Sequence, residues 1–174
     1  MKRMVFSALF IAFGLVIPPM FHALGMGGPV FLPMHIPVLL GGLILGPGAG
    51  VTIGLLTPLL SSLLMGMPPL NSPIVFMMTV ELAVYGLVGG YLMKWRGNLL
   101  LSLVGALIGG RIALGLSVAA VRLVVPFPGT PVAFVAGSLV TGLPGLALQL
   151  VLVPLLTAVL LRTPIGRLAQ HNRP

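Results

Sequence analysis

The stretch Leu107–Leu116 reads LIGGRIALGL and places a single arginine, Arg111, among nine apolar or glycine residues. It lies within a longer run, 98–161, whose only other charged residue is Arg122. The whole chain of 174 residues is 58% hydrophobic and 6% charged, whereas an ordinary soluble domain has about 25% charged residues. This composition predicts an integral membrane protein, and Arg111 then needs a reason to lie within the bilayer.

Turn-forming residues divide the chain into six hydrophobic stretches. A helix needs about 20 apolar residues to cross the hydrocarbon core of a bilayer. The run 4–93 is about four such lengths long, and Gly- and Pro-rich segments break it at 24–33, 46–50 and 66–73. The segment VVPFPGTP at 124–131 cannot be helical and leaves two spans in the second half. We therefore expect an all-α membrane protein over residues 1–174, a single domain formed by a compact bundle of six transmembrane helices. The expected spans are about 4–23, 33–47, 49–66, 73–93, 98–123 and 135–161.

The basic residues set the expected orientation, because Lys and Arg are enriched on the cytoplasmic side of membrane proteins. Six spans place both termini on one side. With the N terminus in the cytoplasm, that side holds Lys2, Arg3, Lys94, Arg96, Arg162, Arg167 and Arg173. No convincing cleavage pattern follows Lys2 and Arg3, so we interpret the first apolar run as an uncleaved helix. We expect a multi-pass protein of the cell membrane with both termini cytoplasmic.

Three polar residues are expected at one depth in the bilayer. Counting about 1.5 Å per helical residue from the cytoplasmic side puts Glu81, Arg111 and Gln149 about 20–22 Å into the membrane. Glu81 is the only acidic residue of the chain, so it is the only carboxylate that Arg111 can meet within this protein. Two interpretations stay open: the two residues line a binding cavity, or they form a buried pair that fixes helix packing.

Further polar residues complete the predicted site. Tyr85 follows Glu81 by one helical turn, His35 and Asn71 lie in or beside outward-facing loops, and Arg122 shares a helix face with Arg111. Two cations near one acid favour an anionic or zwitterionic solute, unless Arg122 extends to the outer interface instead. The predicted substrate-binding residues are Arg111, Glu81, Gln149, His35, Asn71, Tyr85 and Arg122.

The sequence argues against an enzyme. The glycine-rich segment GPGAGVTIG at 46–54 lacks the Lys-Ser/Thr that completes a phosphate-binding loop. One acid and three separated histidines cannot form the inner shell of a catalytic metal, and Ser61, Ser62 and His35 have no orienting acid nearby. The basic residues form no run of the kind that binds nucleic acid. We expect no catalytic residue, no metal and no cofactor.

The segments SALFIAFGLV (7–16), FLPMHIPVLLGGLILGPGAGVTIGLLTPLLSSLLMGMPP (31–69) and ELAVYG (81–86) carry a family resemblance. Together with six spans, they resemble the substrate-binding S component of an energy-coupling factor (ECF) transporter. In that family an Ala-x-x-x-Ala pattern on the first helix docks on a transmembrane coupling subunit, and Ala8 and Ala12 match it. The resemblance implies capture of a vitamin or related micronutrient near the outer face. It also implies uptake with the coupling subunit and two cytoplasmic ATPases.

The resemblance does not name the substrate, because S components share a fold but not their ligand contacts. A carboxylate or phosphate solute such as a pantothenate-like vitamin fits the two cations, and neutral pyrimidine, pyridoxine-like and benzimidazole-type ligands stay open. Two other functions also stay open. A solitary proton-coupled secondary transporter would use Glu81 as its proton carrier, and a structural membrane subunit would bind no ligand.

Overall fold

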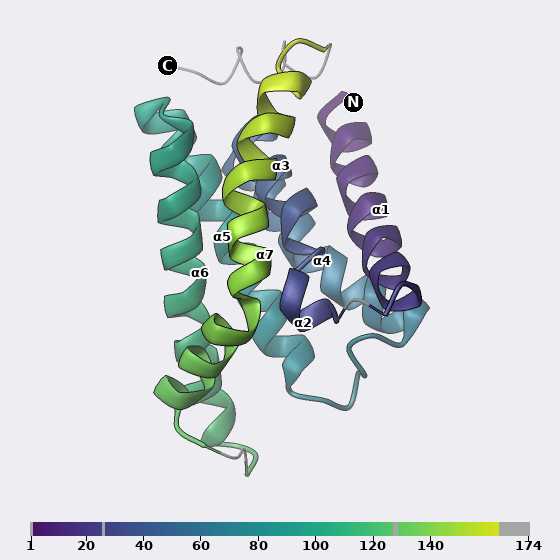
Figure 1. The fold of residues 1–174 in the computed structure, drawn as a ribbon, viewed down its shortest axis with the longest axis vertical. Coiled ribbons are helices and arrows are strands. Elements are labelled where there is room, and N and C mark those ends of the chain that lie inside the picture. Colours follow the sequence, from purple (N-terminus) through teal and green to yellow (C-terminus); the bar gives the residue numbers. More distant parts are fainter. Residues whose placement is uncertain (1, 26, 127–128, 164–174) are drawn as a thin grey trace.

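The computed structural model describes residues 2–25, 27–126 and 129–163 of the chain, and all regular structure in these ranges is helical (Figure 1). Two of the basic residues expected in the cytoplasm, Arg167 and Arg173, lie outside the described residues. The helices are α1 (Lys2–Ala23), α2 (Gly28–Phe31), α3 (His35–Leu45), α4 (Pro47–Met65), α5 (Ile74–Arg96), α6 (Leu99–Arg122) and α7 (Pro131–Leu160).

Within the described residues, six segments are long and apolar enough to cross a membrane, which confirms the all-α, six-span prediction. The second of them, Gly28–Leu45, contains both α2 and α3. The chain breaks between these two helices at Leu32, whose φ of 50° is left-handed. The last span starts at Pro131, earlier than expected, because the Thr130 side chain caps it by accepting a hydrogen bond from the backbone N–H of Ala133 at 3.1 Å.

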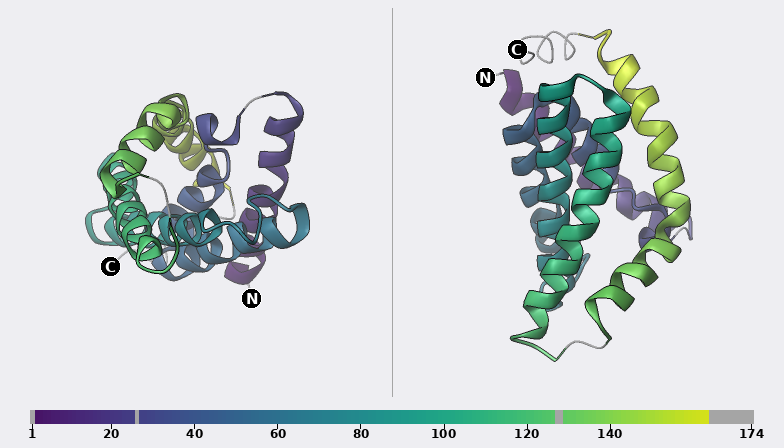
Figure 2. Two further views of the ribbon diagram at one scale, coloured as in Figure 1. Left: turned by 90° about the horizontal axis from the view of Figure 1, so that it is seen from below. Right: turned by 90° about the vertical axis from the view of Figure 1, so that its left-hand side faces the viewer.

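The short helix α3 forms the centre of the bundle. All its residues are buried, and it packs against α1, α4, α5 and α7. By contrast, α1 is the least buried span and packs mainly on α3 and α4. Seen from below, α1 lies at one edge of the bundle, away from α6 and α7 (Figure 2). A helix that is apolar all round and little buried within the protein needs lipid or another protein against it.

Glycines bring α3, α4 and α5 into close contact. A Cβ atom at Gly42 would lie 2.5 Å from the carbonyl oxygen of Gly86, and one at Gly90 would lie 2.6 Å from the backbone nitrogen of Pro47. A side chain at either position would therefore push the helices apart. Such close backbone approach is the usual role of small residues between membrane helices, and it fixes α5, which carries Glu81, against the bundle centre.

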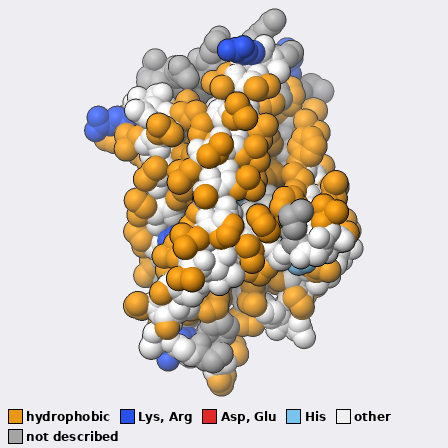
Figure 3. All heavy atoms as spheres, viewed as in Figure 1, with side chains coloured by type: hydrophobic (Ala, Val, Ile, Leu, Met, Phe, Trp, Pro, Cys, Tyr) orange, Lys and Arg blue, Asp and Glu red, His pale blue; other side chains and the backbone are white. Residues whose placement is uncertain are grey.

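Most of the exposed charged residues that the structure describes gather at one end of the molecule, and Arg122 lies at the other. The start of α1, the α5–α6 turn and the end of α7 lie together at the top of Figure 1. These segments hold the exposed residues Lys2, Arg3, Lys94, Arg96 and Arg162. Hydrophobic side chains cover most of the flank between the two ends on the face drawn in Figure 3. This distribution is typical of a protein with its flank in lipid and one basic end.

Candidate functional site

A cavity of about 710 Å³ lies in the half of the molecule opposite the basic end. All seven helices of the described chain contribute to it. They include the end of α1, the short helix α2, the start of α3 and the N-terminal part of α7 as far as Thr141. The break at Leu32 matters here, because Leu32, Pro33 and Met34 line the cavity where the chain turns from α2 into α3. Its volume falls in the range of about 300–1,000 Å³ that is usual for small-molecule sites.

An ion pair within the bundle explains the position of Arg111. Its Nη1 lies 3.0 Å from Oε1 of Glu81, and both side chains are nearly buried, at 10% and 6% exposure. Nη1 also donates a hydrogen bond to the Ser138 hydroxyl at 3.3 Å, and the Tyr85 hydroxyl donates to Oε1 of Glu81 at 3.3 Å. The group joins α5, α6 and α7 and leaves no unpaired charge within it.

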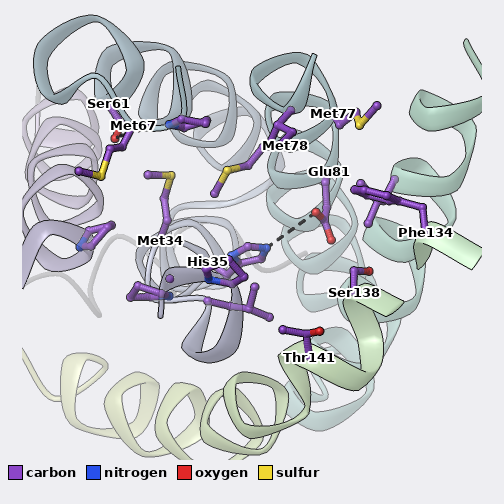
Figure 4. Close-up of a pocket in the computed structure, with 18 of the residues that line it drawn as sticks. Met34, His35, Ser61, Met67, Met77, Met78, Glu81, Phe134, Ser138 and Thr141 are labelled. Carbon is purple, nitrogen blue, oxygen red and sulfur yellow. Dashed lines mark hydrogen bonds and ion pairs between the residues drawn. The ribbon is translucent and has the colours of Figure 1, made fainter. Parts of the chain in front are cut away.

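Local sequence makes room for this polar group. Tyr85 lies one turn after Glu81 on α5, so the two side chains share a face. The residue before the arginine is Gly110, and a Cβ there would lie 2.8 Å from the Tyr85 ring. His35, the first residue of α3, packs edge-on against the same ring with centroids 5.2 Å apart. Its Nε2 lies 4.0 Å from Oε2 of Glu81, the contact drawn dashed in Figure 4.

Several buried polar atoms of the site have no hydrogen-bond partner among the described residues. They are Nε and Nη2 of Arg111 and both ring nitrogens of His35. A buried donor left without a partner costs about 1–3 kcal/mol. These atoms are themselves buried, although the side chains that carry them line the cavity.

The structure brings four of the seven predicted site residues together. Glu81, Arg111 and His35 line the cavity, and Tyr85 lies behind them, fully buried. The other three predicted residues, Gln149, Asn71 and Arg122, are not among the lining residues.

Each of these three lies elsewhere for a physical reason. Gln149 is fully buried, but it lies about 12 Å along α7 from the cavity residue Thr141. Asn71 is exposed in the α4–α5 loop, and Arg122 is exposed as the last residue of α6. The position of Arg122 agrees with extension to the interface rather than with a positively lined cavity. The expected preference for an anion rested on both arginines. Arg122 does not line the cavity, and the charge of Arg111 is balanced by Glu81.

Sequence reasoning missed the apolar part of the site. Four methionines line the cavity together with the ring of Phe134. They come from the α2–α3 link, the loop after α4 and the first two turns of α5. Figure 4 shows them around the same space as Glu81. The only sign of these residues in the sequence is that Met77 and Met78 come about one helical turn before Glu81 and so share its helix face. The four methionines are Met34, Met67, Met77 and Met78.

Six apolar spans around a cavity with one polar cluster define a multi-pass membrane protein with a pocket for a small solute. Residues 2–157 match the family model described as ECF transporter, substrate-specific component. The match covers most of the chain, so this protein belongs to that family and is a substrate-specific transport subunit. The family resemblance drawn from the sequence is thereby confirmed. No curated protein and no solved structure matched the chain.

Proposed function

We propose that this protein captures a vitamin-sized solute in the cavity beside Glu81 and Arg111 and delivers it across the cell membrane. Delivery would use a transmembrane coupling subunit and two cytoplasmic ATPases. The observation that carries the proposal is the cavity of about 710 Å³, whose otherwise mostly apolar lining includes the side chains of Glu81, Arg111 and His35. The basic end is opposite the cavity, so the positive-inside rule supports a cavity near the outer face.

The exposed face of α1 supports docking on the coupling subunit. Ala8 and Ala12 are both exposed and, at a spacing of four residues, lie on one face of the helix. Small residues allow a partner helix to approach closely. The little-buried position of α1 at the edge of the bundle leaves that face open to a partner.

The proton-coupled alternative depends on Glu81 releasing and binding a proton within the membrane. The carboxylate of Glu81 is instead engaged in an ion pair with Arg111 at 3.0 Å, and the chain has no second acid that could carry a proton. The structural-subunit alternative gives no reason for the cavity. Both alternatives differ from our proposal in what they predict. A secondary transporter would take up solute by this chain alone, and a structural subunit would bind no solute at all.

Uptake by cells that lack other S components tests the proposal. The chain would be expressed with and without a coupling subunit and its ATPases, and loss of individual vitamins from a defined mixture would be measured by mass spectrometry. We expect one vitamin to disappear only when all partners are present. Ala8→Trp and Ala12→Trp should abolish this uptake, while Ile112→Trp, which alters a residue on α6 that is 59% exposed, should not. Uptake without the ATPases would contradict the proposal.

A further inference from the structure

We propose that the solute is an uncharged, flat ring compound with one edge that donates a hydrogen bond to Glu81. This inference rests on the proposed function and concerns the same cavity. Three features of the lining carry it: the balance of charge, the acceptor that Glu81 offers, and the kind of apolar side chains that cover the rest. Each is considered in turn.

The charges that line the cavity balance one another. Glu81 and Arg111 are the only Asp, Glu, Lys or Arg side chains among the described lining residues, and they form an ion pair at 3.0 Å. A charged solute would lose its hydration on entry. It would find each opposite charge already engaged, so it would have to break a buried pair to gain a partner. The lining therefore favours a solute without net charge.

The same pair offers an acceptor to a neutral solute. Arg111 uses Nη1 for its contacts with Glu81 and Ser138, and its Nε and Nη2 are buried atoms that a solute in the cavity does not reach. Oε2 of Glu81 lies 4.0 Å from His35, which is beyond hydrogen-bond distance. A group such as a lactam or a carboxamide is uncharged and presents an N–H that can donate to this oxygen. The bond would be charge-assisted and hence stronger than a neutral one.

Four methionines, the Phe134 ring and five prolines make up most of the apolar lining of the cavity, together with four aliphatic side chains. Thioether sulfurs make favourable contacts with aromatic rings, worth about 0.3–1.5 kcal/mol each. Four methionines line this cavity with Phe134. The hydroxyl of Ser61, which also lines it, is already used in a bond to the Met67 carbonyl oxygen at 2.6 Å. A flat aromatic ring fits this lining better than a flexible polyhydroxylated chain, whose hydroxyls would find few partners there.

Three probes that share one ring test the inference on the purified wild-type protein in detergent. They are 2-naphthamide, 2-naphthoate and 2-naphthylmethylamine, which are uncharged, anionic and cationic. Because the ring is constant, differences in binding report the polar group. We expect 2-naphthamide to bind at least about tenfold more tightly than either charged probe, measured by equilibrium dialysis. Equal or tighter binding of a charged probe, or no binding of 2-naphthamide up to about 1 mM, would overturn the inference.

A variant at Glu81 gives a second, internal test. Glu81→Gln leaves Arg111 without its counter-charge, so 2-naphthoate should then bind more tightly than 2-naphthamide. An unchanged order of affinities in folded Glu81→Gln would overturn the inference. The test is also separate from the proposed function. A charged vitamin taken up in the cell assay would refute the inference and leave the function standing, whereas a lack of partner-dependent uptake would refute the function.

Discussion

Replacing Arg111 by methionine tests whether the buried ion pair exists as described. The substitution keeps an unbranched side chain on α6 but removes the charge 3.0 Å from Glu81. Ser138 also loses the hydrogen bond that its hydroxyl accepts from Arg111 and keeps the one that it donates to the Val135 carbonyl oxygen. The carboxylate of Glu81, whose side chain is 6% exposed, is then left without its arginine counter-charge, because Arg111 is the only Lys or Arg among the described lining residues.

The expected loss is large because an unpaired buried charge is costly. Removing one partner of a buried pair typically destabilises a protein by about 3–5 kcal/mol. Both side chains are nearly but not fully buried, so the lower value, about 3 kcal/mol, is appropriate here. For a chain of this length, about 3 kcal/mol corresponds to a fall of about 6–12 °C in the midpoint of thermal unfolding.

The assay is the loss of the monodisperse peak in size-exclusion chromatography after heating purified protein in detergent. The double variant Glu81→Gln/Arg111→Met removes both charges and should recover most of the loss. Arg122→Met is the matched control, because Arg122 is exposed at the end of α6, and it should change the free energy of unfolding by no more than about 0.5 kcal/mol. A midpoint for Arg111→Met within about 2 °C of the wild type would refute the pairing.

Three other outcomes follow from the packing. Gly86→Leu should abolish the yield of folded protein in the same chromatography, because a Cβ there would overlap the backbone of Gly50, whereas Gly48→Leu, with open space around it, should not. Gln149→Met should raise the thermal midpoint, since both amide atoms of the buried side chain lack a described partner and an apolar isostere removes that cost of about 1–3 kcal/mol. Met34→Ala should weaken binding of 2-naphthamide by about three- to tenfold in dialysis, through loss of sulfur–ring and apolar contacts.

Much of the fold was predictable because it depends on composition and length. Long apolar runs separated by Gly- and Pro-rich segments have few alternatives to membrane-spanning helices, and the six spans follow from them. The pairing of Glu81 with Arg111 was among the predicted alternatives for a similar reason. With one acid in the chain, a buried arginine has a single candidate for its counter-charge.

The rest of the site was not predictable by counting residues. The prediction that Glu81, Arg111 and Gln149 lie at equal depth in the bilayer assumes that their helices are similar and cross the membrane in the same way. The structure instead has a 30-residue α7 beside an 11-residue α3, and Ser138, rather than Gln149, reaches Arg111. The methionines were missed because an apolar side chain on a membrane helix suits lipid and cavity equally well. Only the packing distinguishes the two.

The most direct test of the central claim fills the cavity and measures bound solute. Gly137 lines the cavity, and a Cβ there would meet nothing within 4 Å, so Gly137→Phe should occupy the space without disturbing the helix. Val140→Phe is the control on the same helix, at a residue that is 70% exposed and does not line the cavity.

Native mass spectrometry would compare the two variants with the wild type after exposure to a vitamin mixture. We predict that the wild type and Val140→Phe release the same small molecule on denaturation, and that folded Gly137→Phe releases none. Equal release from Gly137→Phe, or an empty spectrum from well-folded wild-type protein, would contradict capture of a solute in this cavity.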